Sequence, residues 1–148
     1  MITLKKIKKI CNELGLRWNF SNGTDGFNKI ELWYNFQMPT GYFLDLNAKE
    51  RNGWYRIGMF KNCNDEAENE DDYKYKSLRC LCSIMYIPPQ YGTEIRSWMS
   101  FAGEYEWFLS LRAEKRIKRS IELLIGLNLA VKKLRIEEAK KKMEADFD

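Results

Sequence analysis

The segment KIELWYNF, residues 29–36, has the spacing of apolar residues on which our prediction of the fold is based. Large apolar side chains occupy every second position, namely Ile30, Leu32, Tyr34 and Phe36. A period of two is typical of a β-strand that buries one face. We therefore predict a strand here, and we expect Trp33, which alternates with the apolar set, to be an exposed ring.

The flanking sequence extends this pattern in both directions. Residues 16–20 also alternate, and turn-forming residues 21–26 separate them from the first segment. After a Pro-Thr-Gly break, alternation returns over 42–46, and Asn52-Gly53 is a strong hairpin signal before a run over 54–60. These segments predict four strands in an antiparallel meander.

Residues 73–87 fit a strand and a helix about equally well. The run is apolar on both faces and ends directly before Pro88-Pro89. We therefore predict a fifth strand.

Both ends of the chain are predicted to be helical. Residues 3–14 show helical spacing, with Thr3 as N-cap and Gly15 as the stop. Near the other end, Thr93 is expected to cap a short helix running through Trp98 to Ala102. A second helix is expected from near Gly103 to about Met143.

This long helix is not uniform in composition. Residues 121–131 are apolar nearly all round, which predicts burial on several sides. Residues 135–148 are expected to form a projecting or frayed helix end. The spacing of apolar residues over 117–134 also fits a homodimer seam, formed by Ile117, Ile121, Leu124, Asn128 and Val131. Packing within one chain explains that spacing equally well.

The order of these elements predicts an α+β fold. It comprises an antiparallel meander sheet of four to five strands, with a short N-terminal and a long C-terminal helix packed on one face. The 148 residues fit a single domain, 1–148. The lysines near the start interrupt any apolar run, so we expect no export signal, no membrane span and a cytoplasmic location.

A cytoplasmic location predicts reduced thiols at Cys11, Cys63, Cys80 and Cys82. Cys80 and Cys82 are spaced to share one face of a strand, but the paired CxxC spacing of a structural metal site is absent. Buried free cysteines are the simpler interpretation, and we expect neither a metal nor a cofactor.

The composition argues against an enzyme. The chain has no histidine, and no motif of nucleotide binding, serine hydrolysis or metalloprotease chemistry occurs. The alternative is a faint carboxylate-and-lysine pattern suited to magnesium: Asp25, Asp45, Asn47 and Lys49. Alternation on a half-exposed sheet produces such sets routinely.

Acidic residues are concentrated in one loop: Asp65, Glu66, Glu68, Glu70, Asp71 and Asp72. A calcium loop needs a glycine for its turn, and this segment has none. Six carboxylates in eight residues can instead imitate nucleic-acid phosphate and occupy a basic groove on another protein. With the rings of Trp33 and Phe43, they are the predicted protein-binding residues.

Basic residues form a second cluster, beside Tyr105, Trp107 and Phe108: Arg112, Lys115, Arg116, Lys118 and Arg119. Basic side chains interleaved with rings can follow a phosphate backbone and stack on bases. A nucleic-acid-binding protein using this cluster, and Lys5 to Lys9, is therefore the alternative prediction. A solvated helix face with its rings in the core is the simpler interpretation.

These observations favour a non-enzymatic protein-binding factor with a protein partner. The lysine, asparagine and isoleucine content would suit an AT-rich phage or bacterial genome. We accordingly expect a small inhibitor or adaptor that acts on a larger, nucleic-acid-handling machine.

Overall fold

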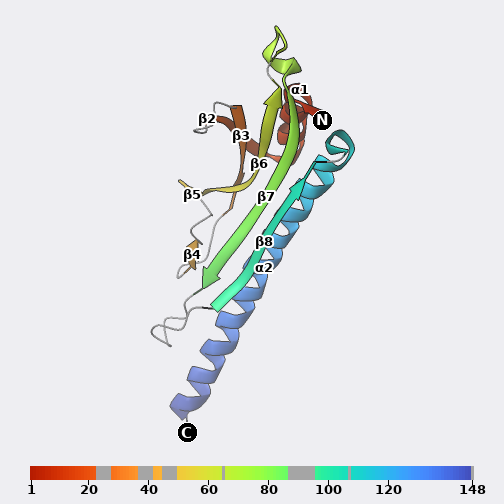
Figure 1. The fold of residues 1–148 in the computed structure, drawn as a ribbon. Coiled ribbons are helices and arrows are strands. Elements are labelled where there is room, and N and C mark those ends of the chain that lie inside the picture. Colours follow the sequence, from red (N-terminus) through yellow and green to blue (C-terminus); the bar gives the residue numbers. More distant parts are fainter. Residues whose placement is uncertain are drawn as a thin grey trace.

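The structure is a computed structural model in which one antiparallel sheet carries two helices (Figure 1). It therefore confirms the predicted α+β fold class. It describes residues 1–22, 28–36, 42–44, 50–64, 66–86, 96–106 and 108–147.

Within these described residues, the sheet has eight strands: β1 (Ile2–Thr3), β2 (Leu16–Asn22), β3 (Asn28–Asn35), β4 (Tyr42–Leu44), β5 (Glu50–Arg51), β6 (Trp54–Asn64), β7 (Lys74–Tyr86) and β8 (Arg96–Tyr105). Strands β2, β3, β6 and β7 are successive neighbours, and all pairs are antiparallel. Strand β7 is the longest and has partners on both edges. Strands β1 and β8 share one edge, while β6 and β4 share the other.

Three predictions from the sequence can be compared with this sheet. The 73–87 segment forms strand β7, as predicted. Asn52 and Gly53 have φ values of 50° and 85° and join β5 to β6, because this turn needs left-handed backbone at both positions. The predicted strand at 42–46 is represented by β4, which pairs with β7 and does not lie between β3 and β6.

Helix α1 (Leu4–Leu14) begins and ends where the sequence predicts. The Thr3 hydroxyl accepts a hydrogen bond from the Lys6 backbone N–H at 3.3 Å. Gly15 adopts φ 68°, and its N–H binds the Cys11 carbonyl. Both caps satisfy backbone groups that a helix end leaves open.

The C-terminal part differs from the prediction. Residues 96–105, expected to hold a short helix and the start of the long one, form strand β8. The reason is the open edge of β7, which β8 covers from Leu78 to Tyr86. Helix α2 (Leu109–Phe147) begins after this strand, and Thr93 lies outside the described residues.

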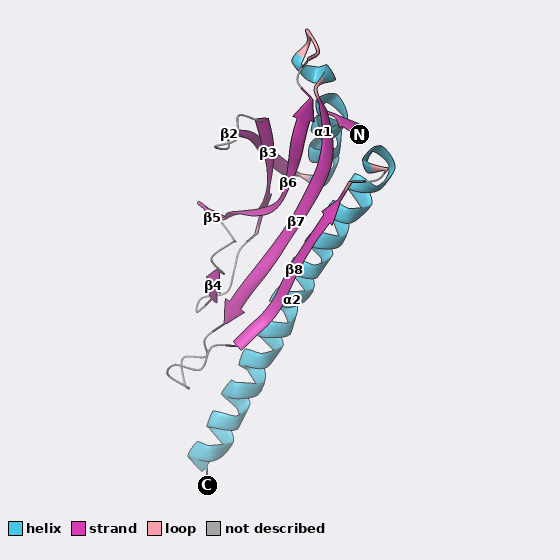
Figure 2. Cartoon of the chain, in the orientation of Figure 1, coloured by secondary structure: helices cyan, strands magenta, loops and turns pink. Residues whose placement is uncertain are grey.

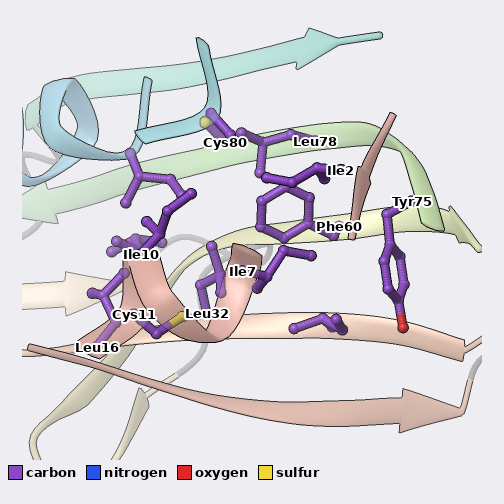
Figure 3. Packing of buried hydrophobic residues seen from close by; sticks show 14 of the residues in the cluster. Ile2, Ile7, Ile10, Cys11, Leu16, Leu32, Phe60, Tyr75, Leu78 and Cys80 are labelled. Atoms are coloured by element: carbon purple, nitrogen blue, oxygen red, sulfur yellow. The ribbon is translucent and has the colours of Figure 1, made fainter. Parts of the chain in front are cut away.

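Both helices pack on the same face of the sheet. Ile7 of α1 lies beside Phe60 (Figure 3). Ile10 of α1 and Leu78 belong to the same buried cluster, which also includes the α2 residues Leu109, Ala113, Ile117 and Leu124. The cluster draws on most elements of the fold, so the sheet and both helices depend on one core.

Helix α2 leaves this core in its second half and extends past the end of the sheet (Figure 2). Leu124 is buried, but Ile125 and Leu129 are exposed. The expectation that residues 121–131 are buried on several sides is therefore wrong for these positions, because the sheet covers only one side of the helix. None of the described helices combines the length and apolarity that a bilayer crossing requires.

Candidate functional site

The acidic loop lies at the turn of the β6–β7 hairpin, at the same end of the molecule as α1 (Figure 1). We call residues 66–72 the acidic tip. Four of its carboxylate residues are exposed: Glu66, Glu68, Glu70 and Asp72. Asp65 lies outside the described residues. The structure thus presents a set of acidic side chains on one projecting turn.

Several hydrogen bonds hold the acidic tip in one shape. A short 3₁₀ turn, η1 (Glu70–Asp72), starts at Asn69, whose side-chain oxygen accepts from the Asp71 N–H at 3.2 Å. The Lys8 ammonium lies 2.6 Å from an Asp71 carboxylate oxygen. The Leu4 N–H donates to the Tyr73 carbonyl at 2.9 Å. The tip is therefore fastened to α1 at two points.

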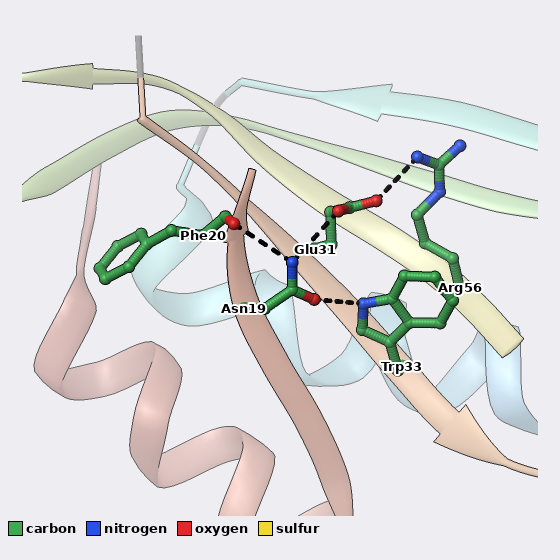
Figure 4. A network of polar contacts seen from close by, with 5 residues as sticks. All are labelled: Asn19, Phe20, Glu31, Trp33 and Arg56. Atoms are coloured by element: carbon green, nitrogen blue, oxygen red, sulfur yellow. Dashed lines mark hydrogen bonds and ion pairs between the residues drawn. The ribbon is translucent and has the colours of Figure 1, made fainter. Parts of the chain in front are cut away.

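Trp33 is buried, with only 4% of its surface exposed. The prediction of an exposed ring at this position is wrong. Burial is possible on this face because the polar group of the ring has a partner there: the indole N–H donates to the Asn19 side-chain oxygen (Figure 4). The side chain of Phe43, the other predicted ring, lies outside the described residues.

Trp33 belongs to a buried polar network on the sheet face opposite the helices (Figure 4). The Arg56 guanidinium lies 2.9 Å from one Glu31 oxygen, and the side chains are only 11% and 7% exposed. The Asn19 amide donates to the other Glu31 oxygen at 3.2 Å. The network thus joins β2, β3 and β6. The alternation of residues 29–36 does not reveal it, because Glu31 lies outside the apolar set, as Trp33 does.

The basic cluster lies on the first turns of α2. Lys115, Lys118, Arg112 and Arg119 are exposed, and Arg116 is partly buried. The Arg116 guanidinium lies 4.5 Å from the centre of the Tyr105 ring, and that of Arg112 lies 5.7 Å from the Phe108 ring. We call Arg112, Arg116 and Arg119 the arginine stripe, because they follow one another along the helix.

Phe108, directly before α2, combines two unusual properties. Its ring is 62% exposed, and its backbone has φ 55°, which is costly for a residue with a branched or bulky side chain. Its carbonyl accepts from the N–H groups of Leu111 and Arg112. The ring is therefore not part of the core, contrary to the simpler sequence interpretation.

Lys8, one of the N-terminal lysines, contacts other residues than the basic cluster does. Helices α1 and α2 are in contact. However, Lys8 is drawn toward Asp71 and lies 5.6 Å from the centre of the Trp18 ring, whereas the arginines lie over Tyr105 and Phe108. Lys8 and the two arginines therefore contact different neighbours.

The described cysteines, Cys11, Cys63 and Cys80, are buried thiols that form no disulfide with one another. Burial raises the pKa of the Cys11 thiol to about 12 and also raises that of Cys80. Within the described ranges, no three Cys, Asp or Glu side chains converge as metal ligands. The side chains of Cys82, Asp25, Asp45, Asn47 and Lys49 lie outside the description.

Three of the five residues predicted to form a homodimer seam pack against the core of their own chain. Ile117 and Leu124 are buried in the core, and Ile121 packs against it. The side chains of Asn128 and Val131 lie outside the description. The seam prediction is therefore wrong for its first half, because the chain's own sheet occupies that face of α2.

No family model matches the chain, and no curated protein or solved structure shows significant similarity to it.

Proposed function

We propose that this protein is a non-enzymatic binding factor that docks on a larger protein through the acidic tip. The observation that carries the proposal is the exposure of four carboxylate residues on a turn that α1 holds in place. A preorganised loop loses little conformational entropy when it binds. The partner surface would be a basic groove, such as one that otherwise receives nucleic-acid phosphates.

The shape of the tip supports this use of its charge. The carboxylate of Asp71 faces Lys8, while Glu66, Glu68, Glu70 and Asp72 are exposed. One carboxylate therefore anchors the turn and the others remain available for a partner. Like charges held close together attract a basic surface strongly and accelerate association at low salt. An inhibitor or adaptor that competes with nucleic acid would use this property.

The test compares two variants of equal charge. The tip variant carries Glu66→Gln, Glu68→Gln, Glu70→Gln and Asp72→Asn. The control carries Glu13→Gln, Glu106→Gln, Glu122→Gln and Asp146→Asn, all at exposed positions elsewhere. A partner is first identified by crosslinking and mass spectrometry, then purified, and its Kd is measured against wild type and both variants.

We expect the tip variant to lose at least tenfold in affinity and the control to lose less than threefold. Oligonucleotide should displace the wild-type protein from the partner. Equal affinities for the tip and control variants would refute the role of the acidic tip.

A second candidate function is binding of single-stranded nucleic acid by the arginine stripe. The specific observation in its favour is the exposed Phe108 ring beside the Arg112 guanidinium, an arrangement in which a base can stack while phosphates pair with arginine. Fluorescence anisotropy with DNA and RNA oligonucleotides across a salt series tests it. Binding that weakens steeply with salt, and fails in Arg112→Glu with Arg119→Glu but persists in Lys133→Glu with Lys141→Glu, would support it.

A further inference from the structure

The second half of α2 presents an apolar stripe that nothing in the described chain covers. We define the apolar stripe as Ile125, Leu129, Ile136 and Met143, all of which are exposed. The last three are each 58–61% exposed. At 3.6 residues per turn, the four side chains lie within about 40° of one another around the helix axis. Exposed apolar residues in line along a helix differ from isolated surface residues, which are normal.

The spacing within the stripe is that of a helix–helix seam. Leu129, Ile136 and Met143 follow one another at intervals of seven, and Ile125 precedes Leu129 by four. Ala139 is also exposed and lies beside the stripe, where a small side chain leaves room for a close neighbour. In this register the second seam position of each heptad holds Ile125, Lys132, Ala139 and Asp146. The stripe therefore offers one continuous row of apolar contacts, of the two rows that a full coiled-coil seam contains. A helix that lies flat on a lipid surface has a wider apolar face, so the stripe fits a partner helix better.

The charges beside the stripe specify the partner further. Lys133 and Lys140 are exposed and follow the stripe along one side, about 20–40° beyond Leu129. Residues 132–142 contain six basic and two acidic residues. A second copy would therefore bring like charges together along the seam. A helix with acidic residues at its flanking positions would instead meet lysines, as in complementary coiled-coil pairs.

The geometry points to the apolar stripe as a docking site for an amphipathic helix that belongs to a partner protein and is acidic along its flanks. This inference goes beyond the acidic tip by adding a second surface, and it rests on the proposed function only in requiring a protein partner. The two surfaces have opposite charge and are separated by the length of the sheet and helix α2 (Figure 1).

The experiment uses the full chain and a designed four-heptad peptide with Leu at a and d and Glu at e and g. A matched peptide carries Lys at e and g. We expect the acidic peptide to bind in the micromolar range and the basic peptide not to bind. Ile136→Asp should weaken binding at least tenfold. The control Ala145→Asp introduces the same charge at an exposed position about 160–200° around the helix from the stripe, and it should leave binding unchanged.

A charge swap provides the second arm of the test. Lys133→Glu with Lys140→Glu should reduce binding of the acidic peptide and permit binding of the basic one. The tip variant described above should bind the acidic peptide as wild type does. A result that refutes the role of the acidic tip can therefore be distinguished from one that refutes the role of the apolar stripe. Absence of acidic-peptide binding would overturn the inference. So would self-association of the wild type that Ile136→Asp abolishes, or tighter binding to phosphatidylserine-containing vesicles than to the peptide.

Discussion

Breaking the buried pair between Glu31 and Arg56 should cost much more stability than breaking the tip pair. In Glu31→Leu, the Arg56 guanidinium loses the carboxylate oxygen that lies 2.9 Å away, in a place where both side chains are nearly inaccessible to water. The Asn19 amide loses the other oxygen of that carboxylate as its acceptor, although it also donates to the Phe20 carbonyl. Removing one partner of a buried ion pair costs about 3–5 kcal/mol, and we expect about 3 kcal/mol here.

The assay is urea unfolding monitored by tryptophan fluorescence and circular dichroism. With an m-value of roughly 1.5–2 kcal/mol/M, the midpoint should fall by about 1.5–2 M. The control Asp71→Asn breaks the Lys8 pair, whose side chains are 38% and 43% exposed, and should cost less than about 1 kcal/mol. The double variant Glu31→Leu with Arg56→Met should be more stable than Glu31→Leu alone, because it leaves no buried charge. A loss below about 1 kcal/mol in Glu31→Leu would refute the reasoning.

Three further predictions concern strain, packing and pH. The left-handed backbone at Phe108 costs about 1–2 kcal/mol, so the Phe108→Gly variant should have a higher thermal unfolding midpoint than wild type. An unchanged or lower midpoint would show that the contacts of the ring outweigh the backbone strain. In Gly58→Ala the new Cβ would lie 3.2 Å from the Arg79 carbonyl oxygen, so urea unfolding should show a loss of about 1–3 kcal/mol, and full stability would contradict this packing. Burial raises the pKa of Cys11 from 9.0 to about 12, so the unfolded chain releases that proton first. The protonated Cys11 thiol therefore makes its full contribution to the free energy of unfolding below pH 9, and this contribution is lost as the pH rises from 9 toward 12. Urea midpoints from pH 8 to 11 should show a decline that is smaller in Cys11→Ala, and an equal decline would argue against Cys11 as its source.

The sequence predicted those parts of the fold that short-range chemistry determines. The Thr3 cap, the Gly15 stop and the Asn52-Gly53 turn each depend on neighbours within a few residues. The alternation around Ile30 and Leu32 likewise identified the face that packs on the helices. In each case, the backbone conformation follows from residue types that favour it locally.

The sequence did not predict features that depend on distant partners. Strand β8 forms because β7 has an open edge, and no period within residues 96–105 reveals that edge. Trp33 can be buried because Asn19, on the neighbouring strand, accepts the hydrogen bond that its indole N–H would otherwise make to water. For the candidate sites, the acidic loop and basic cluster were visible in composition, but the exposure of Phe108 depends on a backbone conformation with no sequence signal.

The central position of β7 has a consequence for synthesis on the ribosome. Tyr75 pairs with Ile2 on one edge and Cys63 on the other, so residues 74–75 find both neighbours in chain already made. Residues 78–86 must wait for Arg96–Tyr105 to emerge before that edge is covered. An uncovered strand edge readily pairs with other chains. Translation that pauses between these two strands should therefore leave an aggregation-prone nascent chain, and chaperones that bind at the ribosome would be most useful to this protein at that stage.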